Sequence, residues 1–284
     1  MDTCKHLLFP GDIGRLQRNL KHFAKAFNAK MGLRPSDVLA CLGLLDGTAR
    51  EISRPTGAYH YQRSVYDGHH RFHGFDYQAV MTPDGIIWQL FGPVSARHTD
   101  SWMVNESKLL ELIRDFCWDD EGKQYFVYAD QGYISSPFLL CPFPVPTELQ
   151  QRVNGAWARL RIGIEWEFGR IVALFQSLDQ TRLQKALKSL VGLWYPVCVL
   201  LTNCLNCMYG CEVGQYFSCP APELEEYLSP PAAAYPEWLA RFRPDPRNMH
   251  LYGDEGFEEH LHAEKRRRQQ HDACMLEIKE RRVV

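Results

Sequence analysis

The pattern of apolar and polar positions predicts a helix, then strands, then further helices. Apolar residues recur at helical spacing from about Asp12 to Met31, with Arg and Lys between them, and Asp12 can cap the helix start. We expect this helix to lie over the core with its charged face in solvent, although a basic face could also contact nucleic acid. Residues 38–45 form an apolar run that ends at Asp46, where Gly47 favours a turn or a bulge.

A hairpin is predicted next. Residues 75–81 alternate between apolar and polar, residues 82–85 read Thr-Pro-Asp-Gly, and residues 86–91 again have the composition of a strand. A tight turn between two such runs is a strong hairpin signal, and Gly92 followed by proline is expected to end the second strand.

The middle of the chain predicts a helix and one more strand. Asp100 can cap a helix that runs to about residue 116, and residues 125–129 are a short apolar run that ends at Asp130. A proline-rich loop is expected over residues 137–146. With strands first and helices between and after them, the fold class is α/β with a mixed sheet flanked by helices.

The last part of the chain is expected to be helical and then irregular. Residues 148–176 are typical of one long helix, or of two that are broken near residues 154–155, and residues 183–208 predict further buried helix. From Ser218 the composition shifts to Pro, Ala and Glu, which packs poorly and predicts a flexible extension. Residues 255–279 could form an isolated charged helix.

These elements suggest three parts. Residues 1–38 form an N-terminal helical segment, residues 39–217 form the α/β domain, and residues 218–284 form the Pro/Ala/Glu-rich and charged C-terminal extension. The length is sufficient for one sizeable core.

Composition narrows the class of protein. Of the 284 residues, 45% are hydrophobic and 23% are charged, which is typical of a globular protein. We find no apolar run that reaches the ~18 residues of a membrane span and no secretory signal, so we expect an intracellular protein without a membrane partner. The 10 cysteines are then reduced thiols or metal ligands. A net charge of −2 does not indicate a nucleic-acid binder, but a local basic groove would suffice for one.

Two acids stand in an otherwise apolar helical stretch, residues 161–170. Glu165 and Glu167 lie among Ile, Trp and Phe, and a buried charge needs a partner or a metal. Residues two apart differ by about 200° around a helix, so only one of these acids can face a shared site. Arg161, four residues earlier, can orient or neutralise Glu165, and Gly169 leaves that face open.

We therefore interpret Glu165 as the third carboxylate of a site with Asp46 and Asp130. Both aspartates follow strand-like runs and precede glycines, and strand ends gather site residues in such sheets. Three carboxylates suit hard divalent ions and a two-metal site. The alternative is that Arg161 and Glu165 form only a surface ion pair.

Four stretches in order carry a resemblance. They are residues 44–48 (Leu-Leu-Asp-Gly-Thr), residues 74–93 with the hairpin, residues 129–133 (Ala-Asp-Gln-Gly-Tyr) and residues 161–170. Together they resemble the DDE-type transposases of the Harbinger/PIF group, which are RNase H-like nucleases. The similarity runs from about residue 40 to residue 230, and its last part, residues 202–228, is similar to fungal members.

The resemblance implies an RNase H-like catalytic domain over residues 39–217. Its three catalytic acids would be Asp46, Asp130 and Glu165, and they would hold two ions of Mg²⁺ or Mn²⁺. The separation of 165 − 130 = 35 residues agrees with the spacing common among such enzymes. The implied reaction is hydrolysis of DNA followed by strand transfer.

The resemblance also implies partners and a location. The substrate would be DNA, at transposon ends or in the genome, and the location would be the nucleus. Arg161, Arg170 and Lys185 are candidates to contact the DNA backbone. Family members usually have an N-terminal helix-turn-helix region, whereas only 45 residues precede Asp46 here. A separate Myb-like protein would then supply sequence-specific binding, and a homodimer is left open.

Two rival functions remain open from the sequence. One is a catalytically inactive, domesticated transposase that binds DNA or protein. The other is an RNase H-like nuclease that acts on RNA.

Histidines near the hairpin have two interpretations. A metal cluster could be built from His69, His70, His73, His98, Asp67 and Asp100. We favour instead that His69, His73 and Asp100 line the substrate groove or support the acids as an outer layer. For Asp100 taken alone, the helix cap is the favoured interpretation.

Two further clusters have uncertain roles. The first is Cys204, Cys207, Cys211 and Cys219, for which zinc is an alternative to the favoured buried thiols. The second is the basic run of residues 265–268 with Arg281 and Arg282, which could be a nuclear-import signal, a DNA-contacting tail or a solvated helix face.

Overall fold

A computed structural model describes most of the first 229 residues. The described residues are 7–9, 11–33, 39–56, 59–68, 70–96, 98–186 and 189–229. The predicted helix over residues 255–279 and the basic run of residues 265–268 therefore lie outside the described residues.

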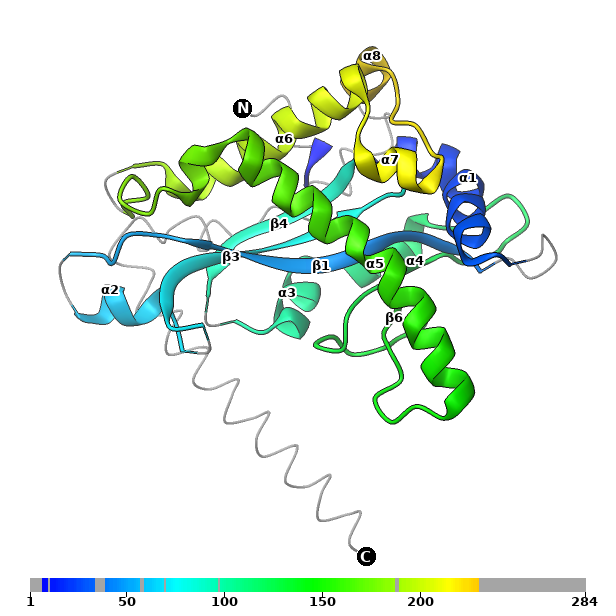
Figure 1. Cartoon of the computed structure of the whole chain (residues 1–284), viewed down its shortest axis with the longest axis horizontal. Coiled ribbons are helices and arrows are strands. Elements are labelled where there is room, and N and C mark those ends of the chain that lie inside the picture. Colours follow the sequence, from blue (N-terminus) through cyan, green and yellow to red (C-terminus); the bar gives the residue numbers. More distant parts are fainter. Residues whose placement is uncertain are drawn as a thin grey trace, which may run out of the picture. The chain divides into compact units, whose positions relative to one another are not determined.

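A mixed sheet forms the centre of the described chain (Figure 1). Its order is β2-β3-β1-β5-β6, and β4 pairs with β3. The pairs β1–β3, β2–β3 and β3–β4 are antiparallel, whereas β1–β5 and β5–β6 are parallel. The strands are β1 (Cys41–Glu51), β2 (Tyr66–Asp67), β3 (Phe72–Met81), β4 (Ile87–Ser95), β5 (Phe126–Tyr128) and β6 (Leu139–Leu140).

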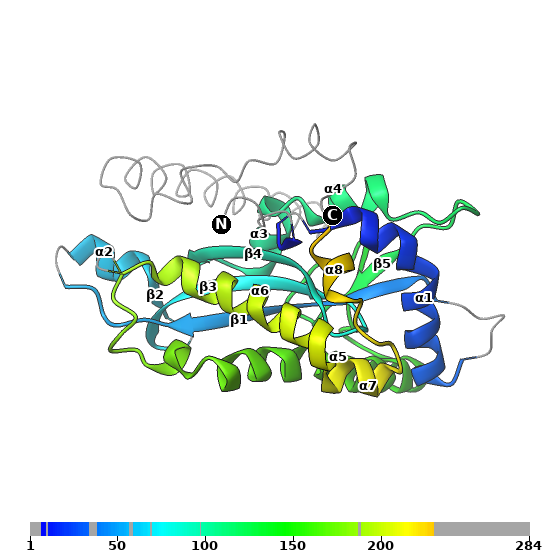
Figure 2. The ribbon, with the colours of Figure 1, turned by 90° about the horizontal axis from the view of Figure 1, so that it is seen from above.

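Helices cover both faces of this sheet. Figures 1 and 2 show α5 and α6 on one face and α3 on the other. The predicted α/β class with a mixed sheet flanked by helices is confirmed, and the arrangement is consistent with an RNase H-like fold. The helices are α1 (Ile13–Met31), α2 (Tyr59–Ser64), α3 (Asp100–Glu106), α4 (Leu109–Phe116), α5 (Glu148–Leu174), the 3-10 helix η2 (Gln176–Asp179), α6 (Val191–Tyr209), α7 (Glu212–Phe217) and α8 (Leu224–Tyr227).

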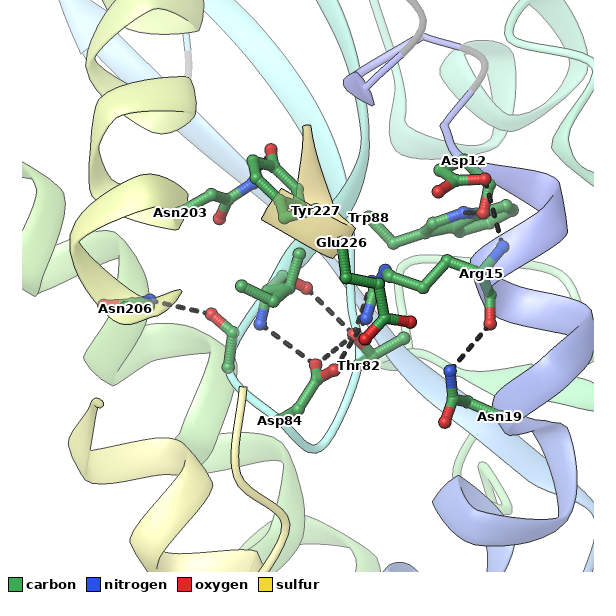
Figure 3. A network of polar contacts seen from close by, with 12 residues as sticks. Asp12, Arg15, Asn19, Thr82, Asp84, Trp88, Asn203, Asn206, Glu226 and Tyr227 are labelled. Carbon is green, nitrogen blue, oxygen red and sulfur yellow. Dashed lines mark hydrogen bonds and ion pairs between the residues drawn. The ribbon is translucent and has the colours of Figure 1, made fainter. Parts of the chain in front are cut away.

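The first helix and the hairpin form as predicted. Asp12 caps α1, because its side chain accepts a hydrogen bond from the backbone N–H of Arg15 at 3.0 Å. Arg15 then reaches from α1 to the turn between β3 and β4, where its Nη1 donates to Oδ2 of Asp84 at 2.7 Å (Figure 3). Both side chains are buried, so this ion pair attaches α1 to the hairpin turn.

Strand β1 is longer than the sequence suggested. It does not end at Asp46, and Gly47 neither turns nor bulges but pairs with Gln78 of β3. The reason is that the antiparallel neighbour β3 accompanies β1 as far as Glu51, whereas pairing with the parallel neighbour β5 stops at Leu44. The apolar run therefore marks only the part of β1 that is covered on both edges.

Two other boundaries differ from prediction. Strand β4 continues beyond Gly92 and Pro93 to Ser95. The helix expected over residues 100–116 is two helices, because Lys108 adopts a left-handed conformation with φ of 56°. Of the two alternatives for residues 148–176, the single long helix is the one observed, because α5 runs without a break through residues 154–155.

Helix α6 packs on the hairpin through polar side chains. It begins at Val191, later than predicted, and by length and composition alone it is apolar enough to cross a membrane. Asn203 on this helix accepts from the N–H of Ile87 and donates to the carbonyl oxygen of Ile87, at 3.0 and 2.9 Å. These paired bonds fasten α6 to β4, so its apolar composition is accounted for by burial in the core of the folded chain.

The packed chain continues past residue 217. Cys219 and Tyr227 are buried, and the Tyr227 hydroxyl accepts a hydrogen bond from Nδ2 of Asn203 at 2.9 Å. Leu7 and Ile86 pack in the same cluster as Tyr227. The prediction of a flexible extension from Ser218 is therefore wrong for residues 218–229, because an aromatic side chain fastens this stretch to α6.

Candidate active site

Asp46 lies on β1, and Asp130 lies two residues beyond the end of the neighbouring strand β5. The last parallel pair between β1 and β5 is Leu44 with Tyr128, and each aspartate follows its member of that pair by two residues. Side chains two residues apart on a strand point to the same face. The two acids therefore lie next to each other just past the point where the pairing between β1 and β5 stops. Strand β5 ends at this point, whereas β1 continues.

Arg161 joins the third acid to the first. Its Nη1 donates to Oδ2 of Asp46 at 2.8 Å, and its Nη2 donates to Oε1 of Glu165 at 3.0 Å. Asp46 is on β1 and Glu165 is on α5, so one guanidinium holds acids from two elements that are far apart in sequence. The predicted Arg161–Glu165 pair thus exists, but it also includes Asp46 and is not an isolated surface pair.

The charges of the three acids influence one another. Burial raises the pKa of the Asp46 carboxyl from 3.8 to about 6, whereas Arg161 and the N–H of Gly47 lower it. Asp130 and Glu165 add to the rise by repulsion between like charges. Asp130 and Glu165 therefore each lie close enough to Asp46 for their charges to raise its pKa.

The acids have the right chemistry for a hard divalent cation, because they offer only carboxylate oxygens. Within the part of the chain that the structure describes, no three His, Cys, Asp or Glu side chains form a ready-made metal site. The positive charge between Asp46 and Glu165 is supplied by Arg161. The donor chemistry fits Mg²⁺ or Mn²⁺, and Arg161 supplies one positive charge to two of the three acids.

Asp100 is close to the acids but does not cap its helix. Thr99 is the N-cap of α3, and its Oγ1 accepts from the N–H of Trp102 at 3.3 Å, so the favoured cap interpretation of Asp100 is wrong. The Asp100 carboxylate lies against Gly47 and Gly132, the glycines that follow the two aspartates. Because Thr99 caps the helix, the Asp100 side chain is not needed for capping and can make another contact.

The histidines are not gathered at the acids. His73 pairs with Tyr66, six residues along β3 from Ala79, the partner of Asp46. Six residues of a strand span about 20 Å. His70 contacts Asp67 at 2.6 Å and His98 stacks on Trp102. His69 lies outside the described residues.

The other two predicted DNA contacts lie apart from the acids. Arg170 is also on α5, but its Nε donates to Oδ1 of Asn206 at 3.1 Å, on the side of the helix that faces α6. Lys185 is exposed in the segment between η2 and α6.

Glu167 is the buried acid of the pair on α5. Glu167 is 1% exposed, whereas the Glu165 side chain is 50% exposed. Its Oε1 accepts from Nδ2 of Asn206 at 2.8 Å, and burial raises its pKa from 4.5 to about 7. The sequence does indicate that Glu167 is on the buried face of the helix. The residues three and four positions from it include Gly163, Ile164 and Ile171, which are apolar and share its face.

The cysteines pack as thiols. Cys211 caps α7, because its Sγ accepts from the N–H of Gly214 at 3.3 Å, and burial raises the pKa of its thiol to about 11. Cys219 is buried as well. Among the described residues, which include all four cysteines of the predicted cluster, no three His, Cys, Asp or Glu side chains are grouped as metal ligands.

Comparison with known families gives one match. The model of the DDE superfamily endonuclease family matches residues 45–203, a range that contains Asp46, Asp130 and Glu165. Comparisons with curated proteins and with solved structures gave no match.

Proposed function

This chain belongs to the DDE superfamily endonuclease family, and from that premise we propose that it cleaves phosphodiester bonds of DNA with Asp46, Asp130 and Glu165 as its catalytic acids. The observation that carries the assignment is the contact of Arg161 with both Glu165, on the same helix, and Asp46, which lies 115 residues earlier in the sequence. Asp130 follows the neighbouring strand β5, two residues after the partner of Leu44. The contact of one guanidinium with acids from β1 and α5 supports the proposal.

The three acids would hold Mg²⁺ or Mn²⁺ through their carboxylate oxygens. Such ions, when bound, make a strong nucleophile of water at neutral pH and stabilise the charge on the departing oxygen. The chain's own contribution is to bring the acids together on rigid elements and to supply a guanidinium beside them. A guanidinium matches the geometry of a phosphate group, so we assign Arg161 to the DNA backbone as well.

The proposal extends to a transposase of the Harbinger type. In that reaction the 3′-OH freed by cleavage attacks a phosphodiester of a target DNA, and a new P–O bond forms as the 3′ oxygen of the target strand leaves. Arg170 and Lys185 would add phosphate contacts away from the acids. Location in the nucleus, a Myb-like partner and a homodimer complete this proposal, and each rests on the family resemblance rather than on a contact in the structure.

The decisive experiment is metal-dependent nicking of supercoiled DNA. We expect the native chain to nick with Mg²⁺ or Mn²⁺ and not with a chelator, and Glu165→Gln to lower the rate at least about a hundredfold, the scale on which loss of transition-state charge stabilisation is felt. Glu148→Gln, an exposed change on the same helix, is the matched control and should nick like the native chain. Equal nicking by the native chain and Glu165→Gln would reject the assignment.

The same assay separates the rival functions. Binding of DNA without nicking by any variant would indicate an inactive binding module. An RNA strand of the same sequence, cut faster than the DNA strand, would indicate an RNase. No contact among the described residues favours either rival.

A further inference from the structure

Two glycines beside the acids accommodate the same side chain. Gly47 follows Asp46 directly, and Gly132 follows Asp130 by two residues. A Cβ atom on Gly47 would lie 3.1 Å from Oδ1 of Asp100, and a Cβ atom on Gly132 would lie 2.9 Å from Oδ2 of Asp100. Both distances are shorter than ordinary van der Waals contact. The Asp100 carboxylate is therefore wedged between the two acid-bearing segments, in space that only glycine leaves open.

Asp100 reaches these segments from the face opposite Glu165. Asp46 turns its side chain toward Arg161 on α5, and Gly47, the next residue of β1, faces the other side of the sheet. Helix α3 lies on that side and begins with Asp100 (Figures 1 and 2). No hydrogen bond to the Asp100 carboxylate forms among the described residues, so packing alone does not explain a charged group at this position.

A hydroxyl group completes the arrangement. Tyr133 is 5% exposed, and its hydroxyl has no hydrogen-bond partner among the described residues. The oxygen lies 3.7 Å from the Cβ position of Gly47, and it interacts electrostatically with Asp100, Asp46 and Asp130. A phenol is protonated at neutral pH and is a hydrogen-bond donor. Buried polar groups are rarely left without a partner, so a donor surrounded by acids calls for an acceptor.

We propose that Asp100 and Tyr133 are positioning residues of the acidic centre. Asp100 fixes the spacing between Gly47 of β1 and Gly132 of the turn after β5. The Tyr133 hydroxyl would donate a hydrogen bond to a carboxylate oxygen of that centre. This inference rests on the proposed function, because it concerns the same three acids. Residues of such an outer layer commonly change metal affinity by 10- to 100-fold.

The test is binding of Mn²⁺ to the full chain, measured by titration calorimetry, together with nicking over a range of Mn²⁺ concentrations. We expect Asp100→Asn and Tyr133→Phe each to weaken Mn²⁺ binding about tenfold or more. Nicking at saturating Mn²⁺ should fall far less than in Glu165→Gln, because neither residue contacts the reacting atoms. The controls are Asp115→Asn and Tyr125→Phe, which change an exposed acid and a tyrosine bonded to Asp119.

A second set of variants tests the wedge itself. Gly47→Ala places a methyl group against Asp100, so we expect it to weaken Mn²⁺ binding about tenfold in the native background and about twofold or less in Asp100→Ala, where the carboxylate is gone. Independent effects of Gly47→Ala and Asp100→Ala would overturn the wedge. Native-like Mn²⁺ binding by both Asp100→Asn and Tyr133→Phe would overturn this inference alone. A native chain that neither binds Mn²⁺ nor nicks DNA would overturn the proposed function and this inference with it.

Discussion

At the scale of single residues, α5 carries two glutamates in opposite environments. Glu165 is half exposed and shares Arg161 with Asp46, so a divalent cation from solvent can replace Arg161 as its partner. Glu167 is enclosed, and its Oε2 has no hydrogen-bond partner among the described residues. The angular separation of two residues on a helix produces this contrast, because α6 and the hairpin turn cover only one of the two faces.

The buried glutamate predicts a pH-dependent stability. Burial raises the pKa of Glu167 from 4.5 to about 7, so the folded state binds this proton more tightly than the unfolded state. Its contribution to the free energy of unfolding is then complete below about pH 4.5 and is lost as the pH rises through about 7. At 1.36 kcal/mol per pKa unit, the loss is about 3 kcal/mol.

Glu167→Gln should remove this pH dependence. Glutamine keeps an oxygen that accepts from Asn206 but cannot ionise, so it carries only a constant loss from its unpaired amide group. We expect the unfolding free energy of the variant, relative to the native chain, to rise by about 3 kcal/mol from pH 4.5 to pH 8 in denaturant titrations. Glu148→Gln should show no such trend. A difference that stays constant with pH would show that burial does not perturb Glu167 as described.

At the scale of elements, the hairpin turn is the point to which α1 and α6 are both attached. Arg15 of α1 contacts Asp84 in the turn, and Asn206 of α6 donates to the carbonyl oxygen of Gly85 at 2.9 Å (Figure 3). Asp84 also accepts hydrogen bonds from Thr82 and Ile86 within the turn. The turn residues therefore have a second task besides reversing the chain, which is to hold a helix on each side.

The Arg15–Asp84 pair predicts strong coupling between α1 and the hairpin. Arg15 is 1% exposed, so Asp84→Asn leaves a buried guanidinium without its counter-charge and should lower the free energy of unfolding by about 3–5 kcal/mol. Arg15→Met combined with Asp84→Asn removes both charges, and we expect it to be more stable than Asp84→Asn alone. Denaturant titration of the two single variants and the double variant measures this coupling.

An exposed pair between the same helix and a different loop provides the comparison. Lys21 contacts Glu121 at 3.0 Å, and both side chains are exposed. The matching cycle of Lys21→Met and Glu121→Gln should give a far smaller coupling, because solvent screens the charges of an exposed pair. Equal coupling in the two cycles would contradict the importance of burial for the Arg15–Asp84 pair.

At the scale of the whole molecule, local signals predicted most elements and contacts between distant residues set their limits. Asp12 and the apolar spacing after it predicted α1, and the sequence of residues 82–85 predicted the hairpin. Both signals act within a few residues of sequence. The end of β1 could not be predicted in this way, because it depends on how far β3 accompanies the strand.

In the candidate site, too, some features could be predicted from local sequence and others depend on contacts between distant residues. The motif positions of Asp46, Asp130 and Glu165, and the spacing from Arg161 to Glu165, could be read from the sequence. That Arg161 also contacts Asp46, and that Asp100 lies against two glycines, required the packing of α5 and α3 on opposite faces of the sheet. Contacts between such distant residues leave no periodic trace in a single sequence.

Tyr227 holds residues 218–229 against the rest of the folded chain. Its ring packs with Leu7 and Ile86, and its hydroxyl accepts from Asn203, the residue that fixes α6 to β4. We therefore expect a chain that ends at Ser229 to unfold at a higher denaturant concentration than a chain that ends at Phe217. The second chain lacks α8 and leaves a cavity and an open face on α6. Tyr227→Ala in the longer chain should reproduce most of the loss, about 3–5 kcal/mol. If both chains unfold at the same denaturant concentration, the folded unit ends at Phe217, as the composition alone suggested.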